Sequence, residues 1–366
     1  MKKVLFVVNL PSPYRVSFFN ELGKLCELTV LFEGHTATDR DAGWTHEEMR
    51  FFRYVFLKGI RTNSDRFVCP GIVKYLGKDW DAIVMGGYSS PTAVIAIEYM
   101  RIRHIPFFLE VDGGFIKNEK KFKYVFKHHL ISSATGWFST GKIITNYLAH
   151  YGADPAKCYL YPFTSLYAAD LQKADSIKAQ DIGQIKAKLG ISEDKVVLSV
   201  GRFMEGKGFD VLIRTITKLS SDVGLYIIGG EAPNEYLSIV DKDYYKRIHF
   251  IGFKSKSELM DYYAIADVFA FPTRSDVWGL VINEAMAFHL PIVTTQMCVA
   301  GLELVQEGEN GHIVQVDDTA EMADAINDVL KFNKAQLYGE QSRRIISGYT
   351  FESMAQRHME VFMEET

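Results

Sequence analysis

Short apolar runs alternate with longer amphipathic stretches, and this alternation constrains the fold of the chain more than any other feature. In the first half, β-rich runs occupy 4–10, 28–32, 54–57, 82–85, 106–111, 136–139 and 159–161. Stretches with helical spacing, such as 14–25 and 92–103, lie between several of them. Strands that are apolar throughout belong to parallel sheets covered by helices on both faces. The first half therefore predicts one α/β domain built on a parallel sheet.

The same alternation restarts after a polar stretch without strand signals. Residues 168–195 have the composition of a linker and a lead-in helix between two domains. Beyond them, apolar runs follow at 196–200, 225–228, 249–253, 268–271, 292–294 and 312–316. A length of 366 residues also fits two domains of ~100–200 residues each. We predict two Rossmann-like domains, over 1–167 and 168–345.

Composition narrows the class of protein. A hydrophobic content of 48% and a charged content of 23% are ordinary for a globular protein with a real core. The net charge of −4 gives no reason to expect nucleic acid as a partner. The apolar run at the start is short and is followed by prolines, so it predicts a strand rather than a signal peptide. The cysteines form no C-x-x-C pair and predict buried thiols: Cys26, Cys69, Cys158 and Cys298.

The stretch 264–295 contains the strongest candidate site. A short apolar strand leads through a polar turn and Gly279 into a helix that begins at Leu280. Such a turn directs the first N–H groups of the helix, and the positive end of its dipole, at a ligand above the sheet, so it suits phosphate. Asp276 and Glu284 frame the turn, and carboxylates accept hydrogen bonds from vicinal hydroxyls. This predicts a nucleoside-diphosphate sugar, although solvated acids near a helix dipole also explain the pair.

A second phosphate-binding element stands at the end of the first strand of the second half. Residues 201–208, GRFMEGKG, nearly match the P-loop pattern G-x4-G-K-[ST]. Gly208 occupies the position of the hydroxyl that binds magnesium in a P-loop, and no second magnesium ligand is evident, which disfavours a kinase or an ATPase. Arg202 and Lys207 remain as two cations that can reach one diphosphate.

These two elements together resemble the retaining GT-B glycosyltransferases, glycosyltransferase family 4 (glycosyl transferases group 1) in particular. Asp276 and Glu284 take the places of the E-x7-E signature, and GRFMEGKG is similar to the G-R-x4-K-G element of that family. Asp276 is a departure, because most members have Glu there. The resemblance implies two Rossmann-like domains that face each other across a cleft, with a last helix within 346–366 that crosses back to the first domain.

The resemblance also implies an activity: retaining, metal-independent transfer of a sugar from a nucleoside-diphosphate donor to an acceptor hydroxyl, without a further cofactor. Arg202, Lys207 and the N–H groups of Gly279 and Leu280 would stabilise the leaving diphosphate. Glu284 is assigned to the ribose and Asp276 to the donor sugar. The remaining residues of the predicted donor site are Gly201, Gly230, Phe253, Trp278 and Val281.

No metal site is predicted. Asp241-Lys242-Asp243 imitates the DxD metal motif of the other glycosyltransferase fold, but it lies in a charged stretch far from the phosphate loops. We interpret it as solvated surface. The cations and the helix dipole already supply positive charge.

Three loops that follow strands of the first domain predict an acceptor pocket, since ligands bind at the carboxyl ends of parallel strands. Asp112 is the candidate catalytic group of this domain, and the histidine that relatives often keep near here is absent. The glycines could equally serve only to turn the chain. The predicted acceptor residues are Pro13, Tyr14, Arg15, Gly87, Tyr88, Asp112 and Gly113.

Residues 115–130 hold five lysines and one acid, interleaved with apolar residues. On a helix, Phe122, Val125, Phe126 and Leu130 share a face that is flanked by Lys120, Lys121, Lys123 and Lys127. This pattern fits a surface helix with its apolar face in the core, and equally a helix that docks on an anionic membrane. We expect a cytoplasmic protein, and in the second case one that is peripheral on the inner face of the plasma membrane. Its acceptor would be a lipid-linked saccharide of bacterial surface polysaccharide synthesis.

Two other functions fit the same frame. A sugar-nucleotide epimerase or phosphorylase would use the same donor site. A non-catalytic sensor would bind the nucleotide sugar without turnover, and the departure at Asp276 favours this alternative.

Overall fold

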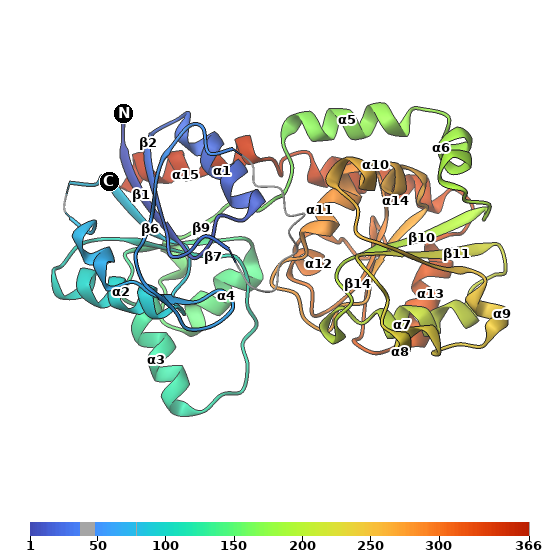
Figure 1. Ribbon diagram of the computed structural model, residues 1–366, viewed down its shortest axis with the longest axis horizontal. Coiled ribbons are helices and arrows are strands. Elements are labelled where there is room, and N and C mark those ends of the chain that lie inside the picture. Colours follow the sequence, from blue (N-terminus) through green and yellow to red (C-terminus); the bar gives the residue numbers. More distant parts are fainter. Residues whose placement is uncertain (37–47, 78, 366) are drawn as a thin grey trace. The chain divides into compact units, whose positions relative to one another are not determined.

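The computed structural model describes residues 1–36, 48–77 and 79–365 and divides the chain into two compact units (Figure 1). Unit 1 comprises Met1–Thr164 and Thr350–Thr366, and unit 2 comprises Ser165–Tyr349. The sequence had placed these divisions at 167/168 and 345/346. Each unit is an α/β domain with a parallel central sheet, which confirms the predicted pair of Rossmann-like domains.

Unit 1 is built on a seven-stranded sheet in the order β3-β2-β1-β6-β7-β8-β9. All of its described strand pairs are parallel, and each apolar run of the first half overlaps one strand of this sheet. The strands are β1 (Lys3–Val8), β2 (Glu27–Phe32), β3 (Arg53–Phe56), β6 (Ala82–Met85), β7 (Phe108–Val111), β8 (Gly136–Ser139) and β9 (Cys158–Leu160), and β4 (Ile60–Arg61) pairs separately with β5 (Phe67–Val68).

Several helices of unit 1 begin at a capping residue or a proline. Ser90 caps α2 by accepting a hydrogen bond from the N–H of Ala93, and Pro91 follows at the first helical position. The helices are η1 (Pro70–Lys74), α1 (Pro13–Gly23), α2 (Pro91–Ile102), α3 (Lys121–Ile131), α4 (Lys142–His150), η2 (Pro155–Lys157) and α15 (Phe351–Glu365). The last helix, α15, packs beside α1, so the predicted return of the chain to the first domain is confirmed (Figure 1).

Unit 2 contains a six-stranded parallel sheet in the order β12-β11-β10-β13-β14-β15. Its strands are β10 (Lys195–Val200), β11 (Val223–Ile228), β12 (Ile248–Ile251), β13 (Val268–Phe271), β14 (Ile292–Thr295) and β15 (Gly311–Val314). Its helices are α5 (Ala168–Lys178), α6 (Ile182–Leu189), η3 (Glu205–Lys207), α7 (Phe209–Thr215), η4 (Ile216–Lys218), α8 (Asn234–Leu237), α9 (Lys242–Tyr245), α10 (Lys256–Ile265), α11 (Leu280–Ala287), α12 (Val299–Leu304), α13 (Thr319–Val329) and α14 (Lys334–Ile346). The predicted linker is therefore mostly α5 and α6.

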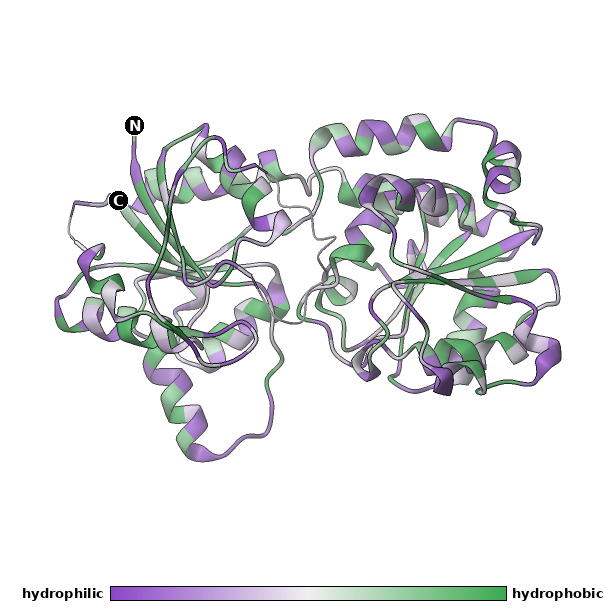
Figure 2. Cartoon of the chain, viewed as in Figure 1, coloured by the Kyte–Doolittle hydropathy of each residue, from purple (hydrophilic) through white to green (hydrophobic). Residues whose placement is uncertain are grey.

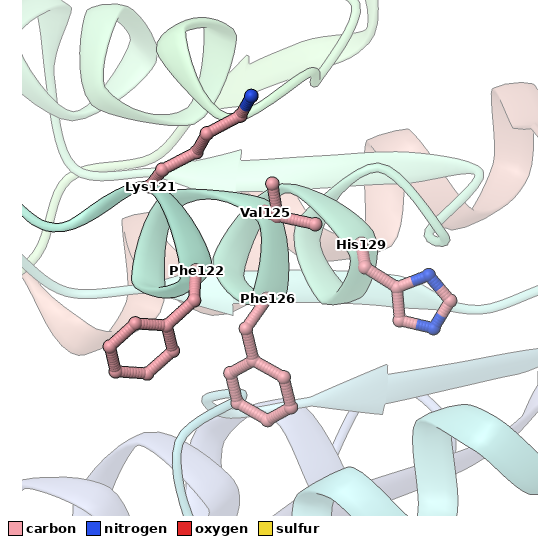
Figure 3. A pocket seen from close by; sticks show the side chains of 5 residues that line it. All are labelled: Lys121, Phe122, Val125, Phe126 and His129. Carbon is pink, nitrogen blue, oxygen red and sulfur yellow. The ribbon is translucent and has the colours of Figure 1, made fainter.

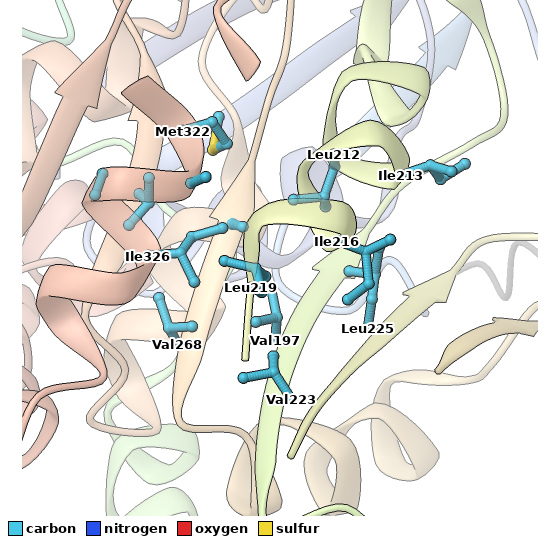
Figure 4. Close-up of a cluster of buried hydrophobic side chains, with 14 of the residues drawn as sticks. Val197, Leu212, Ile213, Ile216, Leu219, Val223, Leu225, Val268, Met322 and Ile326 are labelled. Atoms are coloured by element: carbon cyan, nitrogen blue, oxygen red, sulfur yellow. The ribbon is translucent and has the colours of Figure 1, made fainter. Parts of the chain in front are cut away.

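The core of unit 2 lies between its sheet and the helices α7 and α13. Val197, Leu225 and Val268 come from the strands, and they pack against buried residues of α7 and α13 such as Leu212 and Ile326 (Figure 4). In both units the hydrophobic colour follows the strands, whereas helices such as α5 carry hydrophilic residues along much of their length (Figure 2). This distribution is the one expected of parallel strands buried on both faces.

Both sheets have a point at which the order of the strands reverses. The first strand of each unit lies between its second and a later strand: β1 between β2 and β6, and β10 between β11 and β13. Successive connections run to opposite faces there, and ligands of open α/β sheets bind at the carboxyl ends of the flanking strands. The predicted acceptor and donor loops follow these strands.

Candidate functional site

Two loops of unit 2 are joined at the reversal point of the sheet. Gly206, in the loop after β10, accepts hydrogen bonds of 2.8 Å from the Thr273 hydroxyl and from the Arg274 N–H in the loop after β13. The Arg274 guanidinium also donates to the carbonyl of Glu205 at 2.7 Å and makes a bidentate pair with Asp210. These contacts fix the cation-bearing loop against the loop that carries Asp276.

Gly208 lies where these two loops approach most closely. Its φ of +67° is in the left-handed region, and a Cβ added there would lie 2.1 Å from the carbonyl oxygen of Pro272. A side chain at this position would therefore require the loops to separate. This explains why glycine stands where a P-loop carries its magnesium-binding hydroxyl.

Lys207 and Asp276 form an ion pair across the two loops. Their side chains are 22% and 16% exposed, and the Lys207 ammonium lies 5.0 Å from the centre of the Phe271 ring. The Lys207 side chain also passes Gly201, since a Cβ there would be 3.8 Å from Lys207 Cδ. Arg202 is exposed on the same loop. The structure thus brings together a cation and an acid that the sequence had assigned to neighbouring parts of one donor.

Buried residues support the turn between Asp276 and α11. Trp278 is buried and donates its ring N–H to the side chain of Asn283 at 2.9 Å. Gly279 has a φ of +100°, and a Cβ there would lie 2.8 Å from the sulfur of Cys298. The predicted donor residue Trp278 therefore supports the turn from the interior, while Leu280 and Val281 form the first turn of α11.

Glu284 lies on α11 and is half-buried. Its two carboxylate oxygens accept hydrogen bonds of 3.0 Å from the hydroxyls of Ser165 and Tyr263. Burial raises the pKa of Glu284, and the charge of Lys256 offsets this only in part. Ser165 and Tyr263 escaped the sequence analysis because no motif joins them to Glu284, from which they stand 119 and 21 residues away.

The other predicted donor residues follow neighbouring strands. Gly230 comes after β11 and has open space where a Cβ would be. Phe253 comes after β12 and is 54% exposed, so its ring is available for stacking. Asp243, from the DxD-like stretch, is highly exposed in an ion pair with Lys246 at 3.8 Å. Among the described residues, no three His, Cys, Asp or Glu side chains are grouped so as to hold a metal ion.

The predicted acceptor residues of unit 1 have different environments. Arg15, expected as a cation of the loop, is buried, and it pairs with Glu110 and makes a bidentate contact with Asp112 at 2.7 and 2.8 Å. Asp112 also accepts a 3.0 Å hydrogen bond from the Tyr161 hydroxyl and keeps 22% of its side chain exposed. Pro13 and Tyr14 are partly buried at the start of α1. Arg15 is therefore an internal partner of Asp112.

A pair of tyrosines lies at the second acceptor loop. Tyr88 shares a hydrogen bond between hydroxyl groups with Tyr147 of α4, which the sequence had not singled out. Gly87 has open space where a Cβ would be, and Gly113 is half-buried beside Asp112. Gly114 lies against the Tyr147 ring, which a Cβ would approach to 3.3 Å.

The helix α3 exposes most of its apolar face. Phe122, Val125 and Phe126 are at least half exposed and line a shallow groove with Lys121 and His129 (Figure 3). The expectation that this face lies in the core is wrong for these three residues and right for Leu130. No helix within the described ranges is long and apolar enough to cross a membrane.

The four lysines that flank this face differ. Lys120, Lys121 and Lys123 are exposed. Lys127 instead pairs with Glu119 at 2.9 Å, donates to the Tyr151 hydroxyl at 3.2 Å and lies 4.8 Å from the centre of the Tyr151 ring. These contacts hold Lys127 against unit 1, so the exposed lysines beside the apolar face of α3 are Lys120, Lys121 and Lys123.

Comparisons with known proteins agree with this fold. Residues 181–346 match the family model described as glycosyl transferases group 1. Over 177 residues the chain is 30% identical to an uncharacterized glycosyltransferase of Haemophilus influenzae, which covers 46% of this chain and 49% of that protein. A D-inositol 3-phosphate glycosyltransferase of Mycolicibacterium smegmatis is 33% identical over 161 residues, covering 42% of this chain and 36% of the relative. The chain thus spans about half the length, or less, of these two curated relatives.

Solved structures share the fold over nearly the whole chain. Alr3699/HepE of Anabaena in complex with UDP has a TM-score of 0.79 at 17% identity and covers 100% of both chains. WaaG, a glycosyltransferase involved in lipopolysaccharide biosynthesis, has a TM-score of 0.65 at 16% identity, covering 98% of this chain and 99% of that one. The chain has the GT-B fold, and its residues 181–346 match the domain that defines the glycosyl transferases group 1 family.

Proposed function

We propose that the protein transfers a sugar from a nucleoside-diphosphate donor to an acceptor hydroxyl, with retention of the anomeric configuration and without a metal ion. The observation that carries this proposal is the placement of Lys207 and Asp276 in contact beside the first turn of α11. Solved HepE structures contain UDP or UDP-glucose, which makes a UDP-sugar the first donor to test.

In the proposed reaction, cleavage of the anomeric bond leaves charge on the departing diphosphate. Lys207, Arg202 and the N–H groups that begin α11 stabilise this charge before the acceptor bonds. The acceptor oxygen then bonds to the anomeric carbon on the face that the diphosphate leaves, and the departing phosphate takes the proton of the acceptor hydroxyl. The diphosphate replaces Asp276 as the partner of Lys207, and Asp276 turns to hydroxyls of the donor sugar. Glu284 accepts hydrogen bonds from the ribose, as it does from Ser165 and Tyr263 in this structure. Gly230 and Phe253 hold the base.

The experiment is an incubation of the protein with UDP-, GDP-, ADP- and TDP-sugars, with and without saccharide acceptors, read by NMR of the products. Transfer with the donor's anomeric configuration, unaffected by a chelator, supports the proposal. An epimer of the donor sugar formed without acceptor indicates the epimerase instead. Calorimetric binding without turnover on any acceptor indicates the sensor.

The acceptor that we propose is a saccharide, linked to lipid in a bacterial surface polysaccharide pathway. What favours a lipid-linked acceptor is the exposed aromatic face of α3 beside Lys120, Lys121 and Lys123. Lysines near an anionic bilayer contribute about 1 kcal/mol each. We propose that the protein is cytoplasmic and that this face makes it peripheral on the inner face of the plasma membrane. Nucleic acid is not among the proposed partners. Pro13, Tyr14, Gly87, Tyr88, Asp112 and Gly113 remain the proposed acceptor contacts.

A further inference from the structure

A chain of buried charged groups connects the C-terminal helix of unit 1 with Asp112. His358 of α15 is fully buried; its Nδ1 lies 2.8 Å from the carbonyl oxygen of Met354 and its Nε2 lies 2.9 Å from Glu110 Oε2. The other oxygen of Glu110 accepts a hydrogen bond from Arg15. A second nitrogen of the Arg15 guanidinium then donates to both oxygens of Asp112.

Both ring nitrogens of His358 have a hydrogen-bond partner, so the orientation of the ring is fixed at two points. A backbone carbonyl only accepts, so Nδ1 donates to Met354. Burial by itself would raise the pKa of Glu110, but the charge of Arg15 and the hydrogen bond with His358 outweigh it and lower this pKa. Glu110 is therefore held between Arg15 and the His358 ring.

The four groups balance one another inside the domain. The Arg15 cation lies between the two carboxylates, and the His358 ring contacts the outer side of Glu110, so each buried group has a partner. The His358 ring also stacks on Phe138, with ring centres 4.2 Å apart, which further fixes its orientation. The remaining titratable groups at the cluster are Tyr161, which donates to Asp112, and Tyr14, whose ring centre lies 5.8 Å from the Arg15 guanidinium carbon.

Each group in this chain orients the next. Because the Arg15 guanidinium is planar, its contact with Glu110 fixes the direction in which its other nitrogen meets Asp112. Glu110 is fixed in turn by His358. Asp112 is the group at the end of the chain that keeps an exposed side, where a ligand can reach it.

We propose that Glu110 and His358 are positioning residues of the acceptor site, and that His358 of α15 sets the orientation of Asp112 through Glu110 and Arg15. This inference rests on the proposed function, in which Asp112 contacts the acceptor. It makes the C-terminal helix a functional part of the first domain, although the helix carries none of the predicted site residues.

The first test needs no activity. In ¹⁵N NMR of histidine-labelled full-length protein, we expect the ring signals of His358 to shift in Glu110→Gln, because that variant changes the partner of Nε2. A crystal structure of His358→Gln is expected to show the Arg15–Asp112 contact changed. Unchanged His358 signals in Glu110→Gln, or an unaltered Arg15–Asp112 contact in His358→Gln, overturn the inference even if the protein transfers no sugar.

The second test uses the transferase assay. In His358→Gln we expect the acceptor KM to rise at least ~10-fold while binding of the nucleoside diphosphate is unchanged, because small misplacements of a positioned group reduce productive binding strongly. His150→Gln, at an exposed histidine of α4, is the matched control and should behave as the parent. A folded His358→Gln variant with the parent's acceptor KM contradicts the inference.

Discussion

Lys207 contacts Asp276 across the two loops that flank the reversal point of the second sheet. The two residues stand 69 positions apart, and they meet because β10 and β13 are neighbours in the sheet. Without a donor, the acid neutralises the ammonium. A diphosphate that enters this site carries more negative charge than Asp276, so it can displace the acid from Lys207.

Replacement of Lys207 tests the donor site directly. We expect Lys207→Ala to lose over ~2 kcal/mol of transition-state stabilisation, roughly 30-fold or more in kcat/KM, as when one oxyanion donor is deleted. The measurement is kcat/KM for transfer at a fixed acceptor concentration. Lys246→Ala, at an exposed lysine of the same unit, should match the parent. Unchanged turnover in Lys207→Ala would remove the residue from the mechanism.

Gly206 and Gly208, which lie on either side of Lys207, provide a matched test of the loop geometry. Gly208→Ala should lower the free energy of unfolding by ~2 kcal/mol or more, because it adds left-handed strain to a clash with the Pro272 carbonyl. Gly206→Ala should change stability by less than ~1 kcal/mol, since no atom lies within 4 Å of its added Cβ. Urea unfolding of both variants gives the comparison. Equal destabilisation would mean that the two loops do not approach as closely as described.

Glu33, directly after β2, is expected to make stability depend on pH. Its Oε1 accepts a 2.6 Å hydrogen bond from the Ser90 hydroxyl, whereas its buried Oε2 has no hydrogen-bond partner among the described residues. Burial raises the pKa of Glu33 to about 7, against an ordinary value of 4.5. The folded state therefore binds more protons between these values, and stability falls as the pH rises from about 4.5 through 7.

The measurement for Glu33 is the free energy of urea unfolding between pH 4.5 and 8.5. Relative to the parent, Glu33→Gln should gain up to about 3 kcal/mol over this range, because each pH unit between the two pKa values contributes about 1.4 kcal/mol. Glu27→Gln, at the exposed start of β2, should follow the parent at every pH. A constant difference between Glu33→Gln and the parent would contradict the raised pKa.

The surface of α3 is tested by flotation with lipid vesicles. We expect the parent to float with vesicles rich in anionic phospholipid and not with zwitterionic vesicles, and the binding should weaken with salt. The double variant Phe122→Ser/Phe126→Ser should lose most of this binding because it removes the exposed aromatic area. Phe332→Ser, at a highly exposed aromatic residue of unit 2, is the control and should float as the parent does. Binding that survives in the double variant would exclude this face as the contact surface.

The sequence predicted the two sheets because their signal is local. A strand buried on both faces is apolar throughout, so each apolar run predicted a strand whichever strands lie beside it. The glycine and cation pattern of 201–208 and the Asp276–Glu284 spacing were also local, and the structure places both at the carboxyl edge of unit 2. Cys26, Cys69 and Cys298 are buried as predicted, whereas Cys158 is only partly so.

The spacing of apolar residues does not predict whether the apolar face of a helix packs in the core or is exposed to solvent. The sequence of α3 allowed its aromatic residues to face either the core or solvent, and the structure exposes Phe122 and Phe126. The same holds for single charges. The sequence predicted Arg15 as a cation of the loop. In the structure it is buried and pairs with Glu110 of β7 and with Asp112 of the loop that follows β7.

The sequence by itself determined the fold class, the order of the elements and the two candidate phosphate loops, because apolar periodicity and turn chemistry act over a few residues. Tertiary structure alone decided which polar side chains meet: Lys207 with Asp276, Ser165 and Tyr263 with Glu284, and His358 with Glu110. Those contacts depend on which strands and helices become neighbours. The packing of the whole chain decides which strands and helices become neighbours, so short stretches of sequence do not predict these contacts.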